Sequence, residues 1–182
     1  MKNFSKAFLL VSLALFAFTA LFAQRDNNLF RVNVENSYEV FIADLLPVFV
    51  TRVVDGDTII VSIENPPDGL NKTERVRFLG VDAPETVHPN RKAERFGKES
   101  SEFSKKMLEK KFVYLAFDWD LRDRYGRLLA YVYLEDRACF NAIQLKHGYV
   151  YSYNKFPFRF SEEFQMCEYE AKINKFGLWE GF

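Results

Sequence analysis

Hydrophobic and polar residues alternate along this chain with two different periods, and these periods predict its elements. Residues 48–54 and 59–63 are mainly apolar segments of strand length, and the stretch that ends at Val81 alternates between apolar and charged positions. Residues 112–117 and 128–134 alternate in the same way. A strand turns every second side chain to the same face, so these five segments are predicted to be β-strands. The first three follow one another closely and are expected to form a meander.

Other segments have the longer period of amphipathic helices. Residues 98–111 place Phe103, Met107 and Leu108 on one side and lysines on the other, which predicts a surface helix. The same period, with a glycine after each end, predicts two more helices over residues 141–147 and 161–176.

The order of these elements indicates one class of fold. Three strands, a helix, two strands and further helices are the order of a small closed barrel with added helices. We therefore predict an α+β protein with a five-stranded OB-fold β-barrel and about three packed helices. Its 182 residues suit a single domain, for which 48% hydrophobic and 17% aromatic residues provide a core. Nothing in the sequence implies a stable protein partner, and we expect a monomer.

The N-terminal segment has the features of an export signal. Lys2 and Lys6 precede an uncharged apolar run, and small residues lie just before Gln24. Residues 1–23 are therefore predicted to be a signal peptide, and the protein to be periplasmic or secreted. The alternative is a retained membrane anchor, although the apolar run is close to the shortest that spans a bilayer.

The rest of the chain divides into an extension and the domain. Residues 24–46 form an N-terminal extension that we expect to pack on the domain of residues 47–182. Loss of residues 1–23 removes two lysines and no acidic residue, so the remaining chain has two more acidic than basic side chains. Such a chain does not hold nucleic acid by overall charge, and any such partner requires local basic clusters or a metal. Cys139 and Cys167 either form a disulfide or are two buried thiols.

Two turns combine the residues from which a cation site is built. Asp55 and Asp57 lie in the turn between the first two strands, and Asp82 and Glu85 follow the end of the third strand, which contains Arg77. If the two turns meet, carboxylate oxygens converge beside an arginine, and hard cations such as calcium prefer oxygen ligands. Taken alone, each feature has a simpler explanation, an Asp-Gly turn or a surface ion pair.

Three motifs carry a family resemblance. The chain has VDGDT at residues 54–58, RFLGVDAPET at residues 77–86 and DRYGRLLAY at residues 123–131. In this order and with these spacings, they resemble the staphylococcal-nuclease-like (thermonuclease) family from about Val48 to Trp179.

The resemblance implies a calcium-dependent phosphodiesterase on an OB-fold barrel, which cleaves DNA and RNA and leaves 3′-phosphate products. The matching positions imply the following roles: Asp57, Asp82 and the main-chain carbonyl of Ala83 as calcium ligands, Asp55 as support for the acidic turn, Arg77 and Arg127 as phosphate clamps, and Glu85 as general base. The family commonly has threonine at the position of Ala83, and its hairpin is shorter than the one around Pro66 and Pro67.

Substrate contacts and rival functions complete the predictions. Arg124 and Tyr125 in the third motif are expected to contact the substrate, and Tyr151 and Tyr153 either stack on bases or belong to the core. One rival is a non-catalytic OB-fold module that binds nucleic acid, and another is a structural envelope protein. All five charged positions of the family's site are present, which favours the enzyme.

Overall fold

The computed structural model describes residues 45–85 and 95–181, so the predicted signal peptide and residues 24–44 of the predicted extension lie outside the described residues. Its elements, in chain order, are β1 (Leu46–Asp55), β2 (Thr58–Ser62), β3 (Thr73–Phe78), β4 (Val81–Asp82), α2 (Gly97–Leu108), β5 (Phe112–Ala116), β6 (Leu128–Tyr133), α3 (Phe140–Lys146), β7 (Tyr151–Ser152), α4 (Ser161–Ile173) and a 3₁₀ turn (Gly177–Trp179).

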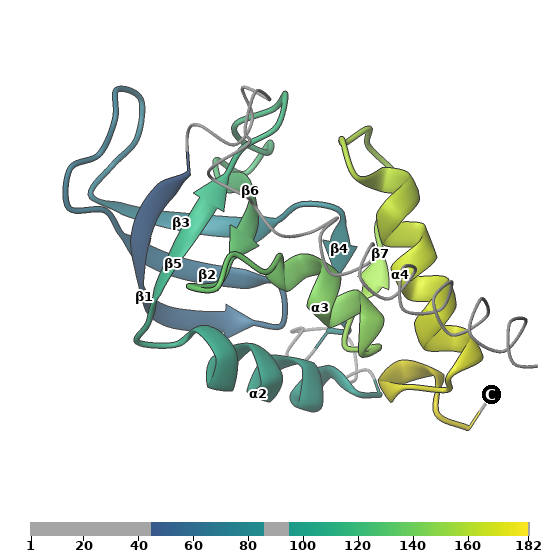
Figure 1. Ribbon diagram of the computed structural model, residues 1–182. Helices are drawn as coiled ribbons and strands as arrows, with labels where there is room; N and C mark the ends of the chain where they lie inside the picture. The colour runs from purple at the N-terminus through teal and green to yellow at the C-terminus, as the bar shows by residue number, and fades with distance from the viewer. Residues whose placement is uncertain (1–44, 86–94, 182) are drawn as a thin grey trace, which may run out of the picture.

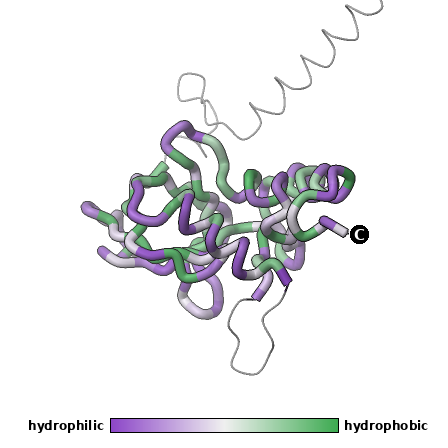
Figure 2. The backbone as a smooth tube through the Cα atoms, turned by 90° about the horizontal axis from the view of Figure 1, so that it is seen from below, coloured by the Kyte–Doolittle hydropathy of each residue, from purple (hydrophilic) through white to green (hydrophobic). Residues whose placement is uncertain are grey.

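Five strands close into a barrel in the order β1-β2-β3-β6-β5 (Figure 1). Neighbouring strands are antiparallel except β3 and β6, which run parallel. Hydrophobic stretches recur along the barrel strands (Figure 2), and their inward side chains are at most 1% exposed: Val50, Ile59, Val76, Phe78 and Leu115. The predicted α+β OB-fold barrel with three helices is confirmed.

The third strand ends earlier than the sequence predicts. The strand expected to continue to Val81 stops at Phe78, and Gly80 has a left-handed φ of 70° that breaks the strand. A Cβ at Gly80 would lie 2.6 Å from the Phe158 ring, so only glycine fits there. The chain then leaves the barrel as β4 and pairs with β7, so the prediction of one continuous strand was wrong.

The helix α2 is correctly predicted, but its buried face differs from the expected one. Ser100, Ser104 and Leu108, four residues apart, are fully buried, whereas Phe103 and Met107 are only partly buried. Small serine side chains allow this helix to approach β1 closely, and β1 is its main contact in the barrel. The apolar period alone does not reveal this face, because two of its three members are polar.

The remaining helices cover one side of the barrel. The helix α3 lies between the barrel and α4 (Figure 1), and the 3₁₀ turn continues from the end of α4. Cys139 and Cys167 are both buried and are not joined by a disulfide, so of the two alternatives the structure has two buried thiols. No helix within the described residues is long and apolar enough to cross a membrane.

Candidate active site

The first motif forms the tight turn between β1 and β2. The main-chain N–H of Asp57 donates to Oδ1 of Asp55 at 3.1 Å, and Oγ1 of Thr58 donates to Oδ1 of Asp57 at 2.9 Å. The first of these bonds, in which an aspartate side chain accepts from the backbone N–H two residues later, is a contact that stabilises turns. The turn holds Asp57 almost completely buried, with 2% of the residue exposed.

Two helices anchor this turn from the interior. The carbonyl oxygen of Gly56 accepts hydrogen bonds from Oγ of Ser104 at 2.7 Å and from Nε2 of Gln144 at 2.6 Å, and Gln144 also donates to Ser104 at 3.0 Å. A Cβ on Gly56 would lie 2.2 Å from Oγ of Ser100, so the approach is as close as glycine permits. Both anchoring side chains are fully buried. The turn that carries Asp57 is therefore fixed by α2 and α3.

Sequence reasoning missed this anchor. Gln144 follows Phe140 by four residues and shares its buried helix face. A polar residue at a core position of a predicted helix is the signal that could have identified it, since buried polar groups require a partner.

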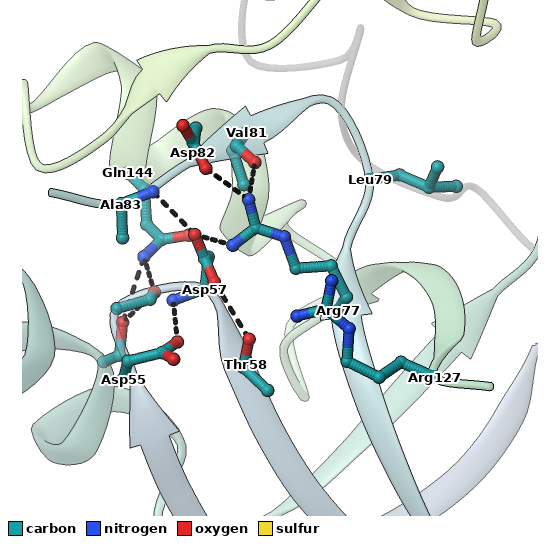
Figure 3. Close-up of polar contacts among 12 residues, drawn as sticks. Asp55, Asp57, Thr58, Arg77, Leu79, Val81, Asp82, Ala83, Arg127 and Gln144 are labelled. Carbon is teal, nitrogen blue, oxygen red and sulfur yellow. Dashed lines mark hydrogen bonds and ion pairs between the residues drawn. The ribbon is translucent and has the colours of Figure 1, made fainter. Parts of the chain in front are cut away.

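Arg77 joins the first motif to the second (Figure 3). Its guanidinium forms an ion pair with Oδ2 of Asp57 and another with Oδ1 of Asp82, the latter at 2.5 Å. Nη2 of Arg77, the atom that contacts Asp82, also donates to the carbonyl of Val81 at 3.1 Å. The N–H of Ala83 donates to Oδ2 of Asp57 at 2.6 Å, which ties the loop after β4 to the acidic turn. The two turns therefore meet, with their carboxylates on the two Nη atoms of one arginine.

The third motif brings Arg127 to the same end of the barrel. Nε of Arg127 donates to Oδ2 of Asp123 at 2.7 Å, and Oδ1 of Asp123 accepts from the main-chain N–H of Tyr125 and of Arg127. Burial raises the pKa of Asp123, but these hydrogen bonds and the charge of Arg127 outweigh burial and hold the pKa below its usual range. In Figure 3 the Arg127 side chain extends toward Arg77.

Asp55 reports the electrostatics of this region. Burial raises the pKa of its carboxyl, and a hydrogen bond to Thr58 and the positive charges of Arg77, Arg75 and Arg127 partly oppose that rise. Three arginines therefore act on one carboxylate. The position of Asp55 agrees with the supporting role implied for it, although the role itself stays a prediction.

Glu85 lies three residues after Asp82 in the loop that follows β4, and its side chain is half-buried. The loop continues into residues 86–94, which lie outside the described residues. Its predicted role as general base stays a prediction.

The predicted substrate-binding residues fall into two groups. Arg124 and Tyr125 lie at the exposed tip of the β5–β6 hairpin, where Nη2 of Arg124 donates to the Tyr125 hydroxyl at 2.6 Å. Tyr151 pairs with Asp82 between β7 and β4, and its ring packs edge-on against Trp179. The N–H of Tyr153 donates to the carbonyl of Gly80 at 3.0 Å. Neither of these two tyrosines is fully buried, so both retain an accessible side.

The carboxylates suit a hard cation by their chemistry. Asp57 and Asp82 offer oxygens only, and both already face one cationic group, the guanidinium of Arg77. No cluster of three or more His, Cys, Asp or Glu side chains that could hold a metal occurs in the described part of the chain. An ion at these two aspartates would therefore take its other ligands from carbonyls, water or substrate.

Comparison with known proteins identifies the family. Residues 75–181 match the family model described as "Staphylococcal nuclease homologue". The chain is 39% identical to a thermonuclease of Staphylococcus hyicus over 131 residues, which cover 71% of this chain and 73% of that protein. It is 37% identical to endonuclease YncB of Bacillus subtilis over 141 residues, covering 74% of this chain and 62% of that protein. The chain belongs to the staphylococcal nuclease family.

Proposed function

We propose that this protein is a calcium-dependent endonuclease that hydrolyses phosphodiester bonds of DNA and RNA. The observation that carries the proposal is the convergence of Asp57 and Asp82 on Arg77 at the end of the barrel that Arg127 also reaches. An ordinary surface ion pair requires only one carboxylate, and here two are held around one arginine by partly buried contacts. The names of the relatives, thermonuclease and endonuclease, support the same reaction.

The arginines are proposed to bind the scissile phosphate. A guanidinium presents two parallel N–H groups that match two phosphate oxygens, and its charge stabilises the extra negative charge of the transition state. Arg127 uses Nε for Asp123, which fixes the direction of its side chain. Arg77 is held by Asp57 and Asp82 until an anion competes for it.

Glu85 is proposed to accept the proton of the attacking water. A carboxylate can act as a general base when it lies within hydrogen-bond reach of the attacking water. The position of Glu85 in the chain, three residues after Asp82 in the loop that follows β4, supports this proposal.

Asp57, Asp82 and the main-chain carbonyl of Ala83 would hold the calcium ion, with Asp55 supporting the turn. The N–H of Ala83 donates to Asp57, and this main-chain contact holds the backbone of Ala83 next to the acidic turn whatever side chain the residue carries. When bound, calcium supplies positive charge that neutralises the phosphate.

Arg124 and Tyr125 are proposed to contact the strand beyond the scissile phosphate, since both are exposed at the hairpin tip. Tyr151 and Tyr153 are proposed to contact it from the β4–β7 side. We further propose that residues 1–23 direct export, that cleavage before Gln24 releases the protein from the membrane, and that it acts as a monomer.

A substrate panel tests the proposed function. Cleavage of single- and double-stranded DNA and RNA is measured for the wild type, Arg77→Lys and Arg127→Lys. Lys105→Gln, a change at an exposed lysine of α2, is the control. Each arginine variant keeps the positive charge but loses the planar guanidinium with its two parallel N–H groups. Both binding and turnover should therefore fall, whereas the control should match the wild type. Binding of nucleic acid without cleavage by the wild type would favour the non-catalytic module.

A further inference from the structure

Arg75 is the basic residue of the site region that neither the motifs nor the proposed mechanism uses. It lies on β3 two positions before Arg77, and both side chains are on the outward face of the strand. Two residues of a strand rise about 6–7 Å, which is comparable to the separation of successive phosphates in a stretched single strand. Arg75 is exposed, and within residues 45–85 and 95–181 its side chain forms no hydrogen bond or ion pair.

The parallel pairing of β3 and β6 places Arg75 beside Arg127. Val76 pairs with Leu128 and Arg77 with Leu129. Arg75 and Arg127 each come immediately before the first of these pairs. They therefore lie side by side on neighbouring segments, separated by about the distance between two paired strands.

A hollow lies between these residues and the tip of the hairpin. It has a volume of about 310 Å³ and is lined by Arg75, Tyr125, Gly126 and Arg127. This is at the small end of ligand sites and suits about one nucleotide unit. The Tyr125 residue is 68% exposed, so part of its ring is available to a base or sugar.

Two like charges beside an open hollow favour an anion. The Arg127 side chain donates to Asp123, whereas the Arg75 side chain forms no ion pair or hydrogen bond with a carboxylate among the described residues, so its guanidinium N–H groups can bind a ligand. The oxygens of a phosphodiester can accept hydrogen bonds from the Arg75 guanidinium while a neighbouring nucleotide contacts Tyr125. Since Arg77 and Arg127 are proposed to bind the scissile phosphate, the phosphate bound by Arg75 is a different one.

We infer that Arg75, together with Tyr125 and Gly126, forms a subsite for the phosphate next to the scissile phosphate, so that the protein favours polynucleotides over diesters with a single phosphate. This inference rests on the proposed nuclease function for its catalytic consequence. The subsite itself requires only that the protein bind a polynucleotide.

The test compares the wild type with Arg75→Gln, Arg75→Lys and the control Lys105→Gln. The substrates are a nitrophenyl ester of thymidine phosphate, which has one diester, and 12-nucleotide single strands of DNA and RNA. Arg75→Gln should raise KM for the 12-mers about 5- to 10-fold at low salt and leave kcat within about twofold. The KM for the one-phosphate ester should not change. Loss of one phosphate contact should also lower the slope of log affinity against log salt by about 0.7 for a single strand. Arg75→Lys should restore most of the salt dependence and part of the affinity.

Binding of a fluorescent 12-mer in chelator separates this inference from the proposed function. If the wild type fails to cleave but Arg75→Gln still weakens binding relative to Lys105→Gln, the subsite stands and the nuclease proposal fails. If the wild type cleaves and Arg75→Gln matches it on the 12-mers, the subsite is wrong. An equal rise in KM for the one-phosphate ester would also overturn the inference, since Arg75 would then act at the scissile phosphate or through the fold. A mononucleotide should displace the 12-mer from Arg75→Gln at a lower concentration than from the wild type, because only the 12-mer loses a contact. Equal displacing concentrations would refute a second phosphate site.

Discussion

Gly56→Ala tests how the acidic turn is positioned. Its backbone is not in the left-handed region, so alanine meets no conformational penalty there, and crowding alone opposes it. The new Cβ would lie 2.2 Å from Oγ of Ser100 and 2.7 Å from Cβ of Ala83, whereas ordinary contacts begin at 3.4 Å. Rotation of the serine hydroxyl relieves only the first contact. The turn must therefore move by about 1 Å, and Asp57 must move with it.

The expected magnitudes follow from that displacement. Overpacking costs about 1–3 kcal/mol, and loss of glycine freedom in the unfolded chain offsets about 0.4–1 kcal/mol of it. A net loss of about 1–2 kcal/mol lowers Tm by about 2–8 °C for a domain of this size. A 1 Å misplacement of a catalytic group can cost about 100-fold in rate, so turnover should fall by that order.

The assay is thermal unfolding together with turnover on a single-stranded 12-mer. Gly69→Ala is the control, because Gly69 has a φ of 84° with nothing within 4 Å of its Cβ position. The free energy of unfolding of Gly69→Ala should fall by about 1 kcal/mol because of backbone strain, and its turnover should stay at the wild-type value. Ser100→Ala combined with Gly56→Ala removes the closest contact and should recover part of both losses. Wild-type turnover and Tm in Gly56→Ala would refute the crowded, helix-anchored turn.

Further predictions concern four other positions. Glu85→Gln should lower turnover by about 10²–10⁴ with little change in substrate affinity, measured by single-turnover kinetics; unchanged turnover would remove its role as general base. Arg124→Ala should weaken substrate binding and leave turnover at saturation near the wild-type value, with a loss that shrinks at high salt. Ala83→Thr should change calcium affinity by less than about threefold by calorimetry if the ligand is the main-chain carbonyl; a large gain would show that the side chain matters. Arg122→Met should destabilise the fold above pH 4.5. Its hydrogen bonds lower the pKa of Glu74, so the folded state binds fewer protons and this stabilisation is lost as pH falls. Denaturant unfolding at pH 7 and pH 3 checks this, and an equal loss at both would contradict it.

The sequence predicts the strands of the barrel well, since inward residues such as Val50, Ile59 and Val76 follow a simple alternation. It fails at Gly80, where the chain leaves the barrel. The left-handed φ of Gly80 breaks the strand there, and the alternation of apolar and charged residues does not reveal it. Gly80 also packs closely against Phe158, a residue distant in the chain.

The candidate site likewise has features that the sequence predicts and features that it does not. Asp57, Arg77 and Asp82 could be predicted to converge, because motifs at strand ends meet when the barrel closes. The support from Ser104 and Gln144 could not, since it depends on how closely two helices approach one turn. Arg75 has no motif, and its position beside Arg127 follows only from the parallel register of β3 and β6.

Cleavage rate as a function of free calcium tests the central claim most directly. The purified wild type and Asp82→Asn are compared on a single-stranded 12-mer, with Asp120→Asn, a change at an exposed loop residue, as control. We expect wild-type and control activity to be absent in chelator and to rise with calcium to a plateau, and Asp82→Asn to need much more calcium or to stay inactive. Full wild-type activity in chelator, or activity supported by zinc and not by calcium, would contradict the proposed calcium-dependent nuclease.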